Sequence, residues 1–273
     1  PGDWLLIVWS LSALAVMHLV WAVVGDRSAH LHELRGMAEG VCDFALRGGT
    51  RQLLPKRALH RPIRALFVTN RLEPGGAERM LVALVQRLAR HGVQPLIACL
   101  KDEGVLAPEC RQHGVPVFDR LLRAKFDVLC IPRMLKLFDR EKIDLVVVGH
   151  SGGDRMFWAT IAARLSGRPV VVWSHWFPDA SARHLEPANR LILGWVDTFV
   201  ALGRLHREAL AQFEHVPIER IEVIPNALDL SPFNGASRRA EIRRELNLTD
   251  DEVAVAIIAN LRTEKRHDVF IEA

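Results

Sequence analysis

Apolar residues between positions 64 and 224 recur with two different spacings. Short continuous runs, such as Leu145–Val148 and Val170–Trp173, are each bounded by polar residues. Runs of this kind are typical of strands in a parallel sheet that is covered on both faces. Other segments place apolar residues every three or four positions, as amphipathic helices do; in the segment 77–91 these residues are Met80, Leu81, Leu84, Val85 and Leu88. The two spacings therefore predict strands that alternate with helices.

This alternation predicts an α/β fold. The expected strands are 65–68, 94–100, 115–117, 145–148, 170–173, 198–201 and 221–224, and the expected helices are 77–91, 105–113, 128–141, 154–165, 189–196 and 205–213. Repeated strand–helix units favour a Rossmann-like, doubly wound parallel sheet. Such sheets bind ligands at the carboxyl ends of their strands, so we looked for functional residues in the loops that follow each strand.

A turn-rich linker from Pro225 to Phe233 follows the last of these strands. Beyond it, the pattern predicts a helix at 236–246, a strand at 253–258 that opens a second domain, and a helix that contains Val269. We therefore predict four parts: an apolar helix (1–25), a basic juxtamembrane segment (26–61), a first domain (62–234) and the start of a second domain (235–273). Because the chain starts at Pro1 and stops inside a predicted helix, we expect a fragment.

The segment Trp4–Val24 is apolar apart from Ser10, Ser12 and His18. It is long enough to cross about 30 Å of hydrocarbon, and a transmembrane helix is the favoured interpretation. A buried globular helix and a secretory signal peptide are the alternatives. A basic stretch follows at 47–64. By the positive-inside tendency it predicts that the chain is anchored with its main body on the cytoplasmic face of a membrane.

Composition and charge narrow the function classes. The chain has 273 residues with 36 basic and 32 acidic side chains, and 49% of its residues are hydrophobic. Most of the basic excess lies within the first 64 residues, so the main body is nearly neutral and no nucleic-acid partner is expected. The four cysteines form no C-x-x-C pair, which argues against a zinc ribbon and fits a reducing compartment.

The first candidate site is the glycine loop Gly75–Gly76, between a predicted strand and a predicted helix. Glycines let a ligand approach the backbone, and the free N–H groups of a helix N-terminus favour a phosphate or a carboxylate. The loop lacks both G-x-G-x-x-G and a P-loop, so neither NAD nor ATP is indicated. The alternative is a tight turn in which Glu78 interacts with the helix dipole.

Two histidines follow neighbouring strands of the expected sheet, namely His150 and His175. A histidine at the carboxyl end of a strand could hydrogen-bond an anion or a sugar hydroxyl. The alternative is a histidine whose hydrogen bonds are satisfied inside the fold. The spacing is not that of a metal motif and no carboxylate completes a ligand set, so we expect no metal.

The third candidate is the segment 260–266, which opens a helix after the predicted strand 253–258. Arg262 and Lys265 could hold a diphosphate there, the arginine through its planar fork and the lysine as a point charge. The alternative is an ordinary solvated helix start.

Three motifs together carry a resemblance to a known family. They are Gly75–Arg79, Ile224–Asp229 with Phe233, and Leu261–Lys265, in this order. The chain from about 63 to 273 resembles the retaining glycosyltransferases of family 4, which have the GT-B fold. The resemblance implies two Rossmann-like domains that bind a nucleotide-sugar between them. It also implies sugar transfer with retained anomeric configuration and without a metal or other cofactor.

The resemblance also implies roles for individual residues. Gly75 and Gly76 match the glycine loop that lies against the donor phosphates and the acceptor, and His175 matches the histidine that contacts the donor sugar. Lys265 matches the lysine that binds the donor diphosphate. Asn226, in the second motif, and His150 complete the expected binding residues.

The sequence departs from the family pattern at three places. Ala227 stands where a glycine is common, and the family's arginine falls at Asn260, so that Arg262 would have to replace it. The family's paired glutamates would lie beyond Ala273, so we expect this chain alone to be inactive.

The expected partners are a nucleotide-sugar, a lipid-linked or polysaccharide acceptor and a membrane surface. The alternatives are another two-Rossmann enzyme, such as a nucleotide-sugar epimerase, and a non-catalytic GT-B-like binding subunit.

Overall fold

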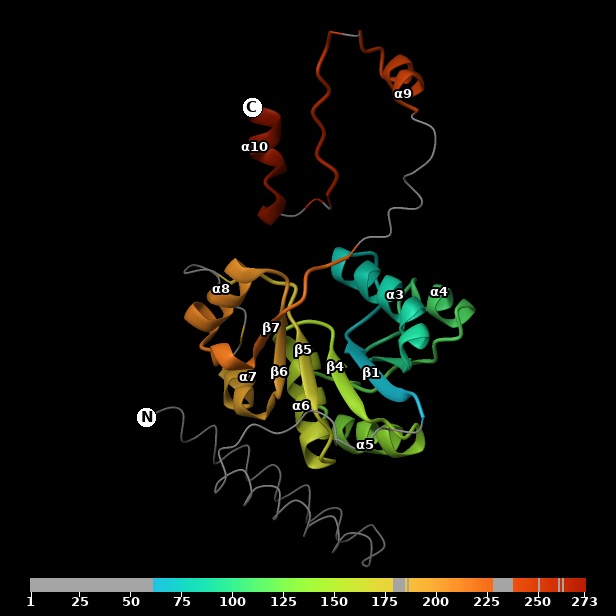
Figure 1. Ribbon diagram of the computed structural model, residues 1–273, viewed down its shortest axis with the longest axis vertical. Helices are drawn as coiled ribbons and strands as arrows, with labels where there is room; N and C mark the ends of the chain where they lie inside the picture. The colour runs from blue at the N-terminus through green and yellow to red at the C-terminus, as the bar shows by residue number, and fades with distance from the viewer. Residues whose placement is uncertain are drawn as a thin grey trace, which may run out of the picture. The chain divides into compact units, whose positions relative to one another are not determined.

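A computed structural model describes residues 61–178, 185, 187–227, 238–249, 251–259, 261 and 263–273 (Figure 1). The predicted apolar helix 1–25 and nearly all of the predicted segment 26–61 lie outside these residues. Within the described part of the chain, no helix combines the length and the apolar character needed to cross a bilayer. The chain divides into two units, with the boundary between Asn226 and Ala227, and each is described by itself. The predicted domain boundaries stay predictions.

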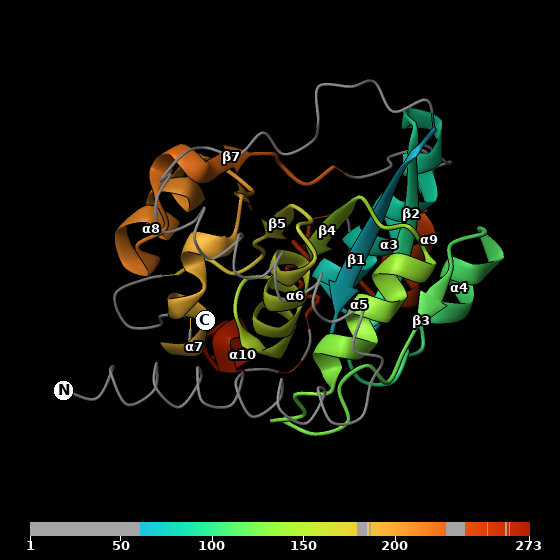
Figure 2. The same ribbon diagram turned by 90° about the horizontal axis from the view of Figure 1, so that it is seen from below.

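The first unit contains a seven-stranded sheet with the order β3-β2-β1-β4-β5-β6-β7. All neighbouring strands are parallel, which confirms the predicted Rossmann-like sheet. Figure 2 shows the strands running from β7 at one side through β5, β4 and β1 to β2. Their bounds are β1 (Ile63–Thr69), β2 (Val93–Cys99), β3 (Val117–Phe118), β4 (Leu145–Val148), β5 (Val170–Trp173), β6 (Thr198–Ala201) and β7 (Ile221–Val223).

The helices follow the predicted apolar stripes, with small differences at their ends. Two predicted helices, 77–91 and 189–196, finish as separate 3₁₀ turns at Ala89–His91 and Leu193–Trp195, which is common at helix termini. A third 3₁₀ turn lies at Ile218–Arg220. The helices of this unit are α3 (Gly76–Leu88), α4 (Ala107–Gln112), α5 (Cys130–Arg140), α6 (Gly153–Leu165), α7 (Pro187–Leu191) and α8 (Arg204–Glu214).

Helices pack on both faces of the sheet, and the alternation along β1 shows why. Ala65 and Phe67 point to a core shared with α3 and α4. Leu66 and Val68 point to a core shared with α5, α6 and α8. Because successive strand residues face opposite sides, a strand buried on both sides must be apolar throughout.

The chain changes direction across the sheet between β1 and β4. From β1 it runs through α3 to β2 on one side, and from β4 it runs through α6 to β5 on the other. The loops that follow β1 and β4 therefore diverge at a topological switch point, which is where open α/β sheets bind ligands. Both loops carry predicted site residues.

The second unit contains α9 (Arg239–Glu245), a 3₁₀ turn (Thr263–Lys265) and α10 (His267–Glu272). The helix predicted around Val269 is confirmed. The strand predicted at 253–258 is wrong, because these residues form no strand, and Val253 and Ile258 are 85% and 98% exposed. A strand is stabilised by hydrogen bonds to a neighbour, and the described residues of this unit contain no other strand with which it could pair.

Candidate functional site

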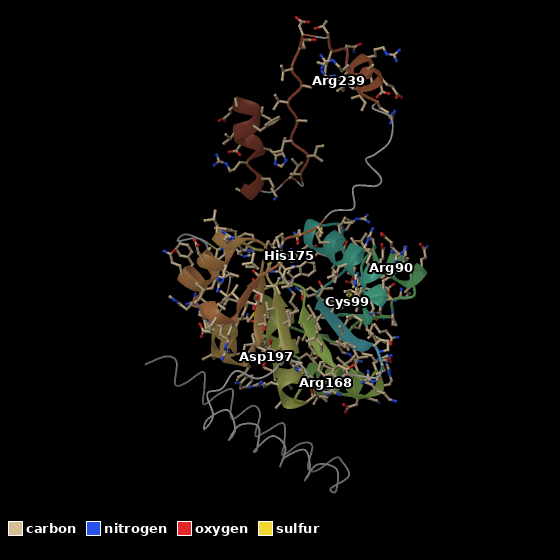
Figure 3. The ribbon with its side chains drawn as sticks, viewed as in Figure 1. Arg90, Cys99, Arg168, His175, Asp197 and Arg239 are labelled. Atoms are coloured by element: carbon tan, nitrogen blue, oxygen red, sulfur yellow. The ribbon has the colours of Figure 1, made fainter. Side chains whose placement is uncertain are left out.

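The candidate site of the first unit lies where the carboxyl ends of β1, β4 and β5 meet. The loops after these adjacent strands carry Gly75, His150 and His175, respectively. Figure 3 shows His175 at this edge of the sheet, whereas Asp197 and Arg168 lie at the opposite edge. The topology therefore places three of the predicted residues at one edge of the sheet.

Gly75 is the residue that precedes α3, and its backbone is extended (φ −151°). Its lack of a side chain leaves room for Glu78, because a Cβ on Gly75 would lie 2.5 Å from the Glu78 Oε2 atom. Glu78 thus folds back over the start of its own helix, where a negative charge is favourable. A Cβ on Gly76 would meet no atom within 4 Å, so the contacts predicted for Gly76 stay a prediction.

The loop before Gly75 is fastened to the loop after β2 by backbone hydrogen bonds. Leu72 N–H donates to the Glu103 carbonyl (3.1 Å), and Leu106 N–H donates to the Leu72 carbonyl (3.0 Å). Gly104 sits between them with φ +75°, and a Cβ there would lie 2.6 Å from the Leu72 carbonyl oxygen. Only glycine combines that conformation with so close an approach. Gly104 could not be predicted as part of the site, because nothing in the local sequence distinguishes it from other loop glycines.

His150 and Ser151 connect the end of β4 to the end of β5. The His150 Nδ1 atom lies 2.8 Å from the Ser151 carbonyl oxygen. The Ser151 and Ser174 hydroxyl oxygens are 3.0 Å apart, and both side chains are buried. This hydroxyl pair links the two loops that carry His150 and His175.

His175 is packed between aromatic rings and is kept neutral by its surroundings. Its ring centroid lies 4.3 Å from that of Trp173 and 6.3 Å from that of His150. The Nε2 atom is buried and has no hydrogen-bond partner among the described residues. Burial, followed by the charges of His206 and Arg155, lowers the pKa of His175 from 6.5 to about 4. At neutral pH the ring is therefore a neutral hydrogen-bonding group whose Nε2 atom is unpaired among the described residues.

His206 supports the backbone next to His175. Its Nδ1 atom accepts the Leu202 N–H (3.1 Å), so the ring proton must lie on Nε2, which donates to the Trp176 carbonyl (2.7 Å). Burial lowers the pKa of His206, while the bond to Trp176 opposes that shift. The sequence analysis did not identify His206, although its position in the first turn of α8 is one where a side chain can bond the preceding backbone.

The other predicted site residues are not shown to lie near His175. Asn226 is exposed after β7, at the end of the first unit, and Lys265 is exposed in the second unit. Arg262 lies outside the described residues. The roles predicted for all three stay predictions.

Comparisons with known proteins define the family. The model of Glycosyltransferase Family 4 matches residues 74–232, which is more than half of the chain. The chain therefore belongs to this family, in agreement with the resemblance carried by its motifs.

Relatives of known name agree with this assignment. An Escherichia coli UDP-Gal:alpha-D-GlcNAc-diphosphoundecaprenol alpha-1,3-galactosyltransferase is 29% identical over 60% of this chain and 44% of its own length. One subunit of an Arabidopsis thaliana phosphatidylinositol N-acetylglucosaminyltransferase is 24% identical over 77% of this chain and 48% of its own length. The chain spans about half the length of these relatives.

A solved structure shares the fold. The structure of Anabaena HepE in complex with UDP and glucose superposes with a TM-score of 0.55 over 68% of this chain and 50% of that one, at 20% sequence identity. This likeness supports the sheet topology described above.

Proposed function

We propose that the protein to which this chain belongs transfers a sugar from a nucleotide-sugar to a lipid-linked acceptor with retention of the anomeric configuration. Membership of Glycosyltransferase Family 4 supports the reaction class. The E. coli relative, named for a UDP-galactose donor and a diphosphoundecaprenol acceptor, supports the substrate classes. The observation that carries the proposal is His175 at the carboxyl end of β5, a neutral histidine whose Nε2 atom has no hydrogen-bond partner in the described part of the chain.

In the proposed reaction the residues of this chain bind the nucleotide-sugar and orient it. The neutral His175 hydrogen-bonds a hydroxyl of the transferred sugar and so fixes the anomeric carbon relative to the acceptor. The helix α3 begins at Gly76, directly after Gly75, and the free N–H groups at its N-terminus favour a negatively charged group of the substrate. Lys265 and Arg262 neutralise the leaving diphosphate, whose charge grows as the glycosidic bond breaks.

We further propose that the protein works at the cytoplasmic face of a membrane, anchored by Trp4–Val24. A lipid-linked acceptor lies in the bilayer, and an anchor would keep the site beside it. The apolar run and the basic stretch that follows it support this location.

A transfer assay on the full-length gene product tests the proposal. We expect sugar transfer from a UDP-sugar to a prenyl-diphosphate-linked sugar, with a product whose anomeric configuration matches that of the donor by NMR. His175→Ala should lower kcat about a hundredfold, as does the loss of one preorganised transition-state donor. His91→Ala, which removes an exposed histidine of the same unit, is the matched control. Binding of the donor without any transfer would contradict the proposal and favour a non-catalytic binding subunit.

A further inference from the structure

Arg155 is the feature of the site that the reaction proposed above does not yet use. It lies in the first turn of α6, two residues after Gly153. The preceding glycines Gly152 and Gly153 both have positive φ (75° and 67°), so the chain turns sharply from β4 into this helix. Arg155 therefore sits beside the switch point between β1 and β4.

The position of Arg155 is unfavourable for folding. The N-terminus of a helix carries a partial positive charge and disfavours a cation there. Arg155 is also mostly buried, and burial lowers the pKa of its guanidinium. Its Nε atom is buried without a partner, and no hydrogen bond or ion pair joins the side chain to any residue in the described ranges. Leaving this Nε donor buried and unbonded costs free energy.

Two carboxylates act on Arg155, namely Asp154 beside it in α6 and Glu78 at the start of α3. The carboxylate of Glu78, at the start of α3, raises the pKa of Arg155 and so partly offsets the effect of burial. The charge of Arg155 in turn lowers the pKa of His175. Arg155 is thus within electrostatic reach of both Glu78 and His175, although the three residues are far apart in the sequence. A largely buried cation at the start of α6, within electrostatic reach of the start of α3 and with an unused donor, matches the chemistry of a phosphate group.

We propose that Arg155 binds the diphosphate of a substrate at the switch point between β1 and β4. This inference rests on the proposed function, in which both the nucleotide-sugar and the lipid-linked acceptor carry a diphosphate. The planar fork of the guanidinium would hold two phosphate oxygens at once. The bound diphosphate would also provide the partner that Arg155 lacks within the described residues of the protein.

Direct binding to the purified chain tests this inference without any turnover. The probes are UDP and farnesyl diphosphate, one for each substrate, followed by isothermal titration calorimetry. Arg155→Gln should weaken the binding of at least one probe about tenfold or more, as expected for the loss of charge-assisted hydrogen bonds. The probe that loses affinity identifies which diphosphate Arg155 holds. Arg155→Lys should recover only part of the affinity, because lysine keeps the charge but not the fork.

Two controls separate ligand binding from a structural role. Arg90→Gln removes an exposed arginine of the same unit and should leave both affinities unchanged. The ligand-free Arg155→Gln variant should melt at the same temperature as the parent chain or higher, because it loses an unpaired buried cation from a helix N-terminus. A lower Tm together with unchanged affinities would overturn the inference, and so would a parent chain that binds neither probe. The transfer assay on the full-length protein tests the proposed function independently of these binding measurements, so the two proposals can fail separately.

Discussion

At the scale of single residues, the site depends on two histidines, His175 and His206, that differ in their hydrogen bonding. His206 uses both ring nitrogens within the fold, on Leu202 and on Trp176. The Nε2 atom of His175 has no partner among the described residues. His206 therefore stabilises the loop after β5, and His175 is carried on that loop.

The lowered pKa of His175 predicts a pH dependence of stability. In the unfolded chain the histidine takes up a proton near its ordinary pKa of 6.5, whereas in the folded chain it does so only near about 4. Between these values the unfolded state binds more protons than the folded state. The contribution of neutral His175 to the free energy of unfolding is therefore fully present above about pH 6.5 and is lost as the pH falls towards 4. We expect the parent chain to lose more stability than His175→Gln between about pH 7 and about pH 5, measured by urea unfolding. Parallel losses in the two proteins would contradict this prediction.

His206 predicts a stability effect that a solvent-exposed histidine would not have. His206→Ala leaves the Leu202 N–H and the Trp176 carbonyl without their present partner, and we expect a loss of about 1–3 kcal/mol in the free energy of unfolding. Denaturant unfolding at neutral pH measures this loss, with His91→Ala as the exposed control. A loss no larger than that of the control would show that these hydrogen bonds contribute little.

At the scale of elements, the position of the glycine loop depends on a contact between two loops. The loop after β2 bonds the backbone of Leu72, and Gly104 is the position at which the two chains come closest. The start of α3 is therefore held by a segment that is distant from it in sequence.

Gly104 and Gly114 allow this contact to be tested by a matched pair of substitutions. Both have φ +75°, but a Cβ at Gly114 would meet no atom within 4 Å. Gly114→Ala should cost about 1–2 kcal/mol from backbone strain alone. Gly104→Ala should cost clearly more, because the same strain is joined by a clash with Leu72. Equal losses in thermal unfolding would mean that the loop moves aside without cost.

Across the whole molecule, the described residues of the first unit include three buried cysteines, which lie on the two sides of its sheet. Cys99 and Cys110 lie in the core shared with α3 and α4, and Cys130 lies in the core shared with α5 and α6. Burial raises the pKa of Cys99 and of Cys130 to about 12 and also raises that of Cys110. These thiols are therefore protonated and shielded in the native state.

This burial predicts that alkylation reports on unfolding of the unit. Iodoacetamide should label Cys99, Cys110 and Cys130 only slowly in the native chain and rapidly in urea, because the thiolate is the reactive form. Peptide mass spectrometry after a short pulse measures each site. Rapid labelling of any of the three without denaturant would contradict the burial described here.

Local patterns in the sequence were enough to predict most of the strands and helices and the edge of the sheet that carries the site. Strand and helix periodicities are local properties, so runs such as Leu145–Val148 and Val170–Trp173 were predicted with the correct bounds. The same local pattern failed at 253–258, because an apolar run becomes a strand only where a neighbour can pair with it.

Which side chains meet at that edge depends on the folded arrangement of the strands and could not be predicted from local patterns. The strand order places the loops of β1, β4 and β5 next to one another, and so brings Arg155 within electrostatic reach of both Glu78 and His175. Burial, proton positions and unused hydrogen-bond donors depend on these neighbours rather than on residue type or spacing. For that reason Gly104, His206 and Arg155 could be recognised only once the chain was folded.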